Sequence, residues 1–190
     1  MHSPTLENHE DATSPWSALT GVRSVKVAPF GRPVEAEVVV PGSKSVSNRA
    51  LILAGMAEGT TRLTGVLRSD DTWWCIDALK RLGCAIEVSD DAVTIAGIGR
   101  RRPRPSGTLH VGSAGTVARF LPPFLAAGCT GEWRVTASKQ MSKRPVAPLF
   151  KALQDGGGKI RFDGVEGGFP AVITGDSFGG GKLAMSGSVS

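Results

Sequence analysis

A lysine, a serine and an arginine follow a Pro-Gly turn and stand where chemistry with an anion is possible. Residues 42–49 read GSKSVSNR, so Lys44, Ser45 and Arg49 lie at the start of an apolar run that is typical of a helix. A helix N-terminus presents unpaired N–H groups and the positive end of the helix dipole, which together favour an anion. Ammonium, hydroxyl and guanidinium groups would add donors to the same ligand. The pattern predicts an anion site, but a capped helix with its charges in solvent also fits it.

A second turn of the same type follows 70 residues later. Residues 112–119 read GSAGTVAR, which repeats the Gly-Ser start and places Arg119 where the first turn has Arg49. Gly115 has no side chain, so the backbone there can approach a ligand closely. Two equivalent helix entries predict sites for two anionic groups.

A third basic stretch, KQMSKRP at residues 139–145, brings Lys139, Lys143 and Arg144 together. Pro145 is expected to start the next helix, because proline is favoured in a first helical turn. The stretch fits a further contribution to the anion site, and it fits a solvated loop equally well.

The two turns open two longer repeats. EGTTRLTG from residue 58 matches TGEWRVTA from residue 130, and ALKRLGCAIEV from residue 78 matches ALQDGGGKIRF from residue 152, in the same order. Each copy then ends on an alternating strand, AVTIAG or AVITG. The sequence of each unit therefore predicts a Gly-Ser turn, then a helix, a strand, a second helix and a pair of strands.

The periodicity of the first unit predicts helices at about 45–57 and 69–83, a strand at 61–66 and a hairpin at 84–97. Ser69, Asp70 and Asp71 are interpreted as cap residues of the second helix rather than as paired catalytic carboxylates.

The repeats also predict the domain organisation. Unit one is expected over about 38–98 and unit two over about 108–176, and a third unit starts at about 183, where a further Gly-Ser pair appears. The sequence is therefore expected to be a fragment with two complete units, preceded by a flexible tail over residues 1–24.

Composition limits the class of protein. The 190 residues are 41% hydrophobic, enough for a sizeable core, and the net charge is +5, which points to anionic partners. No apolar run approaches the roughly 20 residues that cross a bilayer. A secretory signal is not expected, because the first twenty residues contain no Lys or Arg. The three cysteines lack metal-ligand spacing and predict reduced thiols in a cytoplasmic protein without a metal site.

Four strings in the chain resemble the 5-enolpyruvylshikimate-3-phosphate synthase family. They are PGSKSVSNRALILA, SDDT, GSAGTVARF and MSKRPVAPL, in this order and at these separations. The resemblance runs from about Val25 to the last residue and covers the front half of the family's chain.

This resemblance implies a transferase of the shikimate pathway, and so of aromatic amino-acid and chorismate biosynthesis. Such an enzyme moves the enolpyruvyl group of phosphoenolpyruvate onto the 5-hydroxyl of shikimate 3-phosphate and releases phosphate, with no cofactor. The implied fold is α/β, an inside-out α/β barrel of repeated βαβαββ units with two domains. Residues 25–190 would form an incomplete substrate-binding domain, which would need the complementary C-terminal half for activity.

The resemblance also implies residue roles. Lys44 would be catalytic and would contact both substrates, and Ser45, Arg49 and Ser190 would bind shikimate 3-phosphate. Gly115 and Arg144 would bind phosphoenolpyruvate.

Two residues depart from the family pattern, because Ser113 stands where the family often has Asn and Phe120 stands where it commonly has Pro. These departures bear on the phosphoenolpyruvate site and on sensitivity to glyphosate, the family's inhibitor at that site.

Two alternatives remain at this point. The related UDP-N-acetylglucosamine enolpyruvyl transferases carry Asn at the position of Ser45, which disfavours that reading. A non-catalytic anion- or nucleic-acid-binding module could use GRRRPRP at residues 99–105, although Gly and Pro indicate a surface loop there. We therefore expect neither a nucleic-acid nor a membrane partner.

Overall fold

The structure of the chain, a computed structural model, describes residues 12–17, 24–99 and 105–185. Two sequence predictions fall outside these ranges: Ser190, and residues 100–104 of the arginine-rich stretch. Most of the expected start of a third unit also lies outside them, since only 183–185 are described there.

The first unit contains the helices and strands that its periodicity predicts. They are α1 (Lys44–Met56), β1 (Thr60–Thr64), α2 (Asp70–Leu82), β2 (Ala85–Val88) and β3 (Ala92–Ala96). The strands form an antiparallel sheet in the order β1-β3-β2, with Ala96 opposite both Thr60 and Ala85.

The second unit contains one more strand and one more helix. Its elements are β4 (Ser106–His110), α3 (Val117–Gly128), β5 (Glu132–Thr136), α4 (Lys139–Ser142), α5 (Ala147–Asp155), β6 (Ile160–Phe162) and β7 (Ala171–Thr174). The sheet order is β4-β5-β7-β6, and only the β4–β5 pair is parallel. Pro145 does not start a helix as expected, because α5 begins two residues later and has Pro148 in its first turn.

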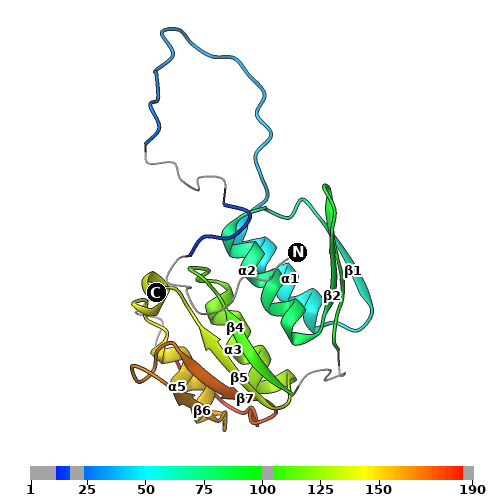
Figure 1. Ribbon diagram of the computed structural model, residues 1–190, viewed down its shortest axis with the longest axis vertical. Coiled ribbons are helices and arrows are strands. Elements are labelled where there is room, and N and C mark those ends of the chain that lie inside the picture. Colours follow the sequence, from blue (N-terminus) through cyan, green and yellow to red (C-terminus); the bar gives the residue numbers. More distant parts are fainter. Residues whose placement is uncertain (1–11, 18–23, 100–104, 186–190) are drawn as a thin grey trace.

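The two units differ at their first strand. Residues 36–40, which correspond to β4 by the 70-residue offset, form no strand and run through the loop that projects from the body in Figure 1. Val38, Val39 and Val40 are 75%, 93% and 76% exposed. Among the described residues no strand pairs with the outer edge of β1, which is the edge that corresponds to the β4-paired edge of β5 in the second unit. The first helix or strand of unit one among the described residues is therefore α1, which begins at Lys44.

Helix α2 shows why these sequences fold locally as they do. The Ser69 side chain accepts the Thr72 N–H and the Thr72 hydroxyl accepts the Ser69 N–H, which is a capping box. Gly83 ends the helix with φ 110°, a left-handed conformation that glycine adopts without strain. Asp70 and Asp71 lie at the positive end of the helix dipole, which favours carboxylates there. The predicted cap at Ser69 is confirmed.

One apolar core joins the two units. Figure 1 shows α1 and α2 side by side between the two sheets, and α2 packs against β4 while α1 packs against α3. Leu51 and Leu79 of the first unit and Val117 and Leu121 of the second are at most 1% exposed within this core. The relative positions of α1, α2 and α3 are therefore set by packing.

A short N-terminal segment, residues 12–17, packs on α2 and is called the strap below (Figure 1). The Ser14 N–H donates to Asp70 Oδ1 at 2.7 Å, and the Trp74 indole N–H donates to the Ala12 carbonyl at 3.1 Å. Trp16 is half-buried, with the Arg68 guanidinium 5.6 Å from its ring centre. The structure therefore differs from the expected flexible tail at residues 12–17, because these contacts fix them to the body.

Within the described ranges, no helix is long and apolar enough to cross a membrane.

Cys75, Cys84 and Cys129 are buried thiols. Burial raises the pKa of Cys84 from 9.0 to about 11, and burial together with the neighbouring Cys84 raises the pKa of Cys75 well above its ordinary value. Both thiols therefore stay protonated in the folded chain at pH values where the unfolded chain has ionised them.

We predict that the free energy of unfolding falls as pH rises from about 9 to about 11. The contribution of a thiol whose pKa is raised on folding is complete below its unfolded pKa and is lost as pH rises through its folded pKa. Urea titrations followed by tryptophan fluorescence measure it. A Cys75→Ala, Cys84→Ala double variant should lose most of this dependence. An unchanged slope in that variant would show that other groups cause it.

Candidate anion-binding site at two helix N-termini

The first Gly-Ser turn forms the start of α1. Ser43 is the N-cap, and its hydroxyl accepts the Val46 N–H at 3.4 Å. A methyl group on Gly42 would lie 2.0 Å from the Gly65 carbonyl oxygen, so only glycine fits between the turn and the end of β1. The cap and the exposed side chains of Lys44 and Ser45 occur together at this turn, so capping does not exclude an anion site.

Arg49 folds back over the same turn. Its Nη1 donates to the Ser45 carbonyl at 3.0 Å, as the four-residue spacing on one helix face allows. Its guanidinium carbon also lies 4.9 Å from the centre of the Phe120 ring on α3, a cation–π distance. Phe120, which departs from the family pattern, thus contacts the arginine of the other turn.

Lys44 has a partner that sequence reasoning missed. Its ammonium lies 3.1 Å from Asp71 Oδ2, and the two side chains are 54% and 14% exposed. Asp71 was interpreted only as a residue of the α2 cap. The two positions are 27 residues apart, and no periodicity links them. The sequence shows only that one expected helix starts with a basic residue and the next with acidic residues.

The second Gly-Ser turn lies under α2. Gly112 has φ 52°, and a methyl group on it would lie 2.4 Å from Cδ1 of Trp74. Its carbonyl accepts the Ser138 N–H at 3.0 Å, and the hydroxyls of Ser113 and Ser138 are 2.7 Å apart. These bonds fix the turn to the start of α4.

The second turn brings Gly115 and Arg144 together. A methyl group on Gly115 would lie 3.0 Å from Arg144 Nη1, so the guanidinium rests against the glycine. No side chain caps α3 at Thr116. The Ala118 and Arg119 N–H groups donate to the Ala114 and Thr116 carbonyls, so backbone donation to a ligand would have to come from the residues before Ala118. Backbone donors and a guanidinium together suit a carboxylate or phosphate.

Arg119 holds this arrangement. Its Nη1 donates to the Gly115 carbonyl at 3.0 Å, and its Nη2 donates to the Pro145 carbonyl at 3.1 Å. The first bond repeats the Arg49–Ser45 bond of the other turn at the 70-residue offset. Arg119 therefore ties the glycine turn to the backbone beside Arg144, and the repeat was the sequence signal for it.

The first turn of α2 lies between the two helix entries. Asp71 contacts Lys44 of the first entry, and Trp74 contacts Gly112 of the second. Trp74 also packs edge-on against His110 at 4.7 Å, and His110 Nδ1 is 2.9 Å from the Thr136 hydroxyl. The distance between the two sites thus depends on α2, and Trp74 acts as a packing residue.

The remaining candidate residues lie elsewhere. Lys139 and Lys143 are exposed on and beside α4, and Ser190 is outside the described residues. Within the described ranges, no three His, Cys, Asp or Glu side chains are grouped to hold a metal ion.

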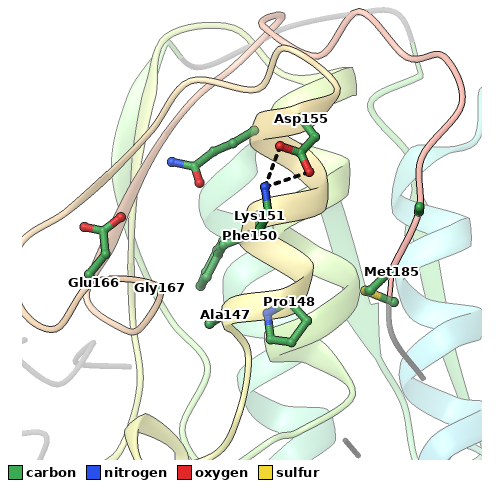
Figure 2. A pocket seen from close by; sticks show the side chains of 10 residues that line it. Ala147, Pro148, Phe150, Lys151, Asp155, Glu166, Gly167 and Met185 are labelled. Carbon is green, nitrogen blue, oxygen red and sulfur yellow. Dashed lines mark hydrogen bonds and ion pairs between the residues drawn. The ribbon is translucent and has the colours of Figure 1, made fainter. Parts of the chain in front are cut away.

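Two apolar pockets lie next to α5, and one of them borders the second turn. One, of about 570 Å³, is lined by Phe150, Glu166 and Met185 and by the Lys151–Asp155 ion pair drawn in Figure 2. The other, of about 490 Å³, is lined by Arg119, Phe120, Pro145, Leu149 and Met185. None of Lys44, Arg49 and Arg144 lines either pocket, whereas Arg119 lines the second.

The chain matches known proteins over most of its length. Residues 30–190 match the family described as EPSP synthase (3-phosphoshikimate 1-carboxyvinyltransferase). The 3-phosphoshikimate 1-carboxyvinyltransferase 2 of Halalkalibacterium halodurans is 44% identical over 181 residues, which cover 95% of this chain and 40% of that protein. The 3-phosphoshikimate 1-carboxyvinyltransferase of a Sulfurovum species is 40% identical, covering 89% of this chain and 40% of that protein.

A solved structure shows the same fold. The EPSP synthase from Acinetobacter baumannii superposes with a TM-score of 0.66 at 34% identity, covering 79% of this chain and 33% of that chain. The chain spans about 40% of the length of the two curated relatives.

The two glycines of the second turn should respond differently to alanine. Gly112→Ala should lower the free energy of unfolding by at least about 2 kcal/mol, because it strains a positive φ and overlaps Trp74. Gly115→Ala should cost less than about 1 kcal/mol, because its near neighbours are the ends of arginine side chains.

Urea denaturation of the two variants measures this contrast, and each serves as the control for the other. Equal losses of stability would mean that Gly112 is not pressed against Trp74.

Proposed function

Because the chain belongs to the EPSP synthase family, we propose that it supplies one wall of an active site for enolpyruvyl transfer. The proposed reaction moves the enolpyruvyl group of phosphoenolpyruvate to the 5-hydroxyl of shikimate 3-phosphate and releases phosphate. The observation that carries the proposal is the pair of repeated helix entries, each with a glycine and an arginine that folds back over it.

Shikimate 3-phosphate is assigned to the first entry. Ser45 offers a hydroxyl and Arg49 a guanidinium beside the N-terminus of α1, and both side chains are exposed. A phosphate dianion there would accept charge-assisted hydrogen bonds and would lie at the positive end of the helix dipole. Ser190 is assigned to the same ligand by the family resemblance alone.

Phosphoenolpyruvate is assigned to the second entry. The uncapped start of α3 offers backbone N–H groups, and Arg144 rests against Gly115. Glyphosate would compete there, and its fit would depend on Phe120, whose ring lies under Arg49.

Lys44 is assigned to both substrates. Its flexible ammonium leaves the first entry toward α2, which also borders the second entry. A positive charge between two anions lowers their mutual repulsion and can stabilise charge that develops as the enolpyruvyl carbon is attacked. We therefore assign Lys44 as catalytic, in an addition–elimination reaction that uses no metal or organic cofactor.

The chain by itself is proposed to bind substrates without turning them over. Ser45, Arg49 and Arg144 are all exposed to solvent. Catalysis of this kind needs both anions held in line in a site that excludes water. The complementary C-terminal half of the enzyme is proposed as the partner that closes the site. The buried thiols of the three cysteines favour a cytoplasmic location.

Ligand binding to the purified chain tests the two assignments against each other. Arg49→Ala should weaken shikimate 3-phosphate roughly tenfold or more and leave phosphoenolpyruvate nearly unchanged, and Arg144→Ala should do the reverse. Lys44→Met should weaken both ligands. Isothermal titration calorimetry with each ligand measures the affinities.

The matched control is Lys151→Met, since Lys151 also pairs with an aspartate but lies on α5. It should change neither affinity. Loss of both ligands in both arginine variants, or of neither, would contradict the assignment of one substrate to each entry.

A further inference from the structure

We propose that Asp71 is a positioning residue that holds the Lys44 ammonium in one place between the two helix entries. The ion pair itself is a property of the chain without ligand, whereas its consequence for binding rests on the proposed function of Lys44.

Asp71 is the fixed member of the pair. It lies in the first turn of α2, which the Ser69–Thr72 capping box anchors, and the Thr72 hydroxyl donates to the Leu67 carbonyl at 2.6 Å. The Asp71 side chain is 14% exposed, and its Oδ2, the atom facing Lys44, is buried from water. The lysine side chain is 54% exposed and has a long flexible stem. Pairing therefore restricts the lysine far more than the aspartate.

The adjacent carboxylate, that of Asp70, has a different partner. Asp70 accepts the Ser14 N–H at 2.7 Å and so holds the strap, whereas Asp71 is 3.1 Å from the Lys44 ammonium. The two aspartates carry the same charge at the same end of one helix. Only one of them contacts the lysine, so a pair of single substitutions separates contact from net charge.

The Lys44–Asp71 ion pair matters for binding because of the direction in which it holds the lysine. α2 borders the first entry through Asp71 and the second through Trp74, so an ammonium on Asp71 lies on the side of the first entry that faces the second. A lysine already ordered there loses less side-chain entropy when an anion binds. The Asp71 carboxylate also offsets part of the positive charge of Lys44. Asp71 therefore fixes the position of the Lys44 ammonium more than it strengthens the attraction of Lys44 for anions.

The rate at which an amine-reactive N-hydroxysuccinimide ester labels Lys44 tests the inference without any ligand. Peptide mass spectrometry reports the Lys44 rate relative to Lys151 in the same molecule. Asp71→Asn should raise this ratio roughly two- to fivefold, the range expected for the loss of one partly exposed ion pair. Asp70→Asn should leave the ratio unchanged, and Asp71→Glu should return it toward the wild-type value.

An unchanged ratio in Asp71→Asn, or an equal rise in Asp70→Asn, would overturn the proposal. Near-UV circular dichroism checks that each variant is folded, and Asp71→Ser provides a second test if Asn at this position disturbs the helix start.

Labelling in the presence of shikimate 3-phosphate separates this inference from the proposed function. Protection of Lys44 in the wild-type chain would support both. A faster rate in Asp71→Asn with no protection by the ligand in any variant would uphold the positioning role and refute the assignment of Lys44 to this substrate.

Discussion

The first turn of a helix carries backbone N–H groups that the helix cannot satisfy, and both repeat units place such a turn at the same point. Glycine makes this placement possible, because Gly42 is pressed against the Gly65 carbonyl and Gly112 against the Trp74 ring. A side chain at either position would push the turn away from its neighbour. The first contact seats the α1 turn against the end of β1, and the second seats the turn before α3 against α2.

The two repeat units share one structural feature of the turn and differ in another. Arg49 and Arg119 each donate to the carbonyl four residues earlier, so the arginine that braces the turn is common to both units. Around the first turn the exposed polar groups are side chains on α1, whereas at the second turn α3 starts without a side-chain cap and Arg144 lies against Gly115. The two turns thus present different groups, as the proposed assignment of a different anion to each turn requires.

The local part of this structure could be predicted from the sequence. Helix caps such as Ser69 and the strands other than β4 follow from short-range periodicity and from the repeat, and the repeat and the family resemblance located Gly115 and Arg144. The contacts that were missed join residues far apart in the chain. The Lys44–Asp71 pair and the docking of the strap on Asp70 depend on how α2 packs, which no local pattern encodes.

The central claim is that the two helix entries hold two different anions. Backbone amide chemical shifts of the ¹⁵N-labelled chain, followed by NMR during titration with shikimate 3-phosphate and then with phosphoenolpyruvate, test it most directly. The account predicts saturable shifts that are largest at residues 43–47 for the first ligand and at 115–118 for the second. Shifts centred on α5 and its pocket, or the same residues responding to both ligands, would contradict it.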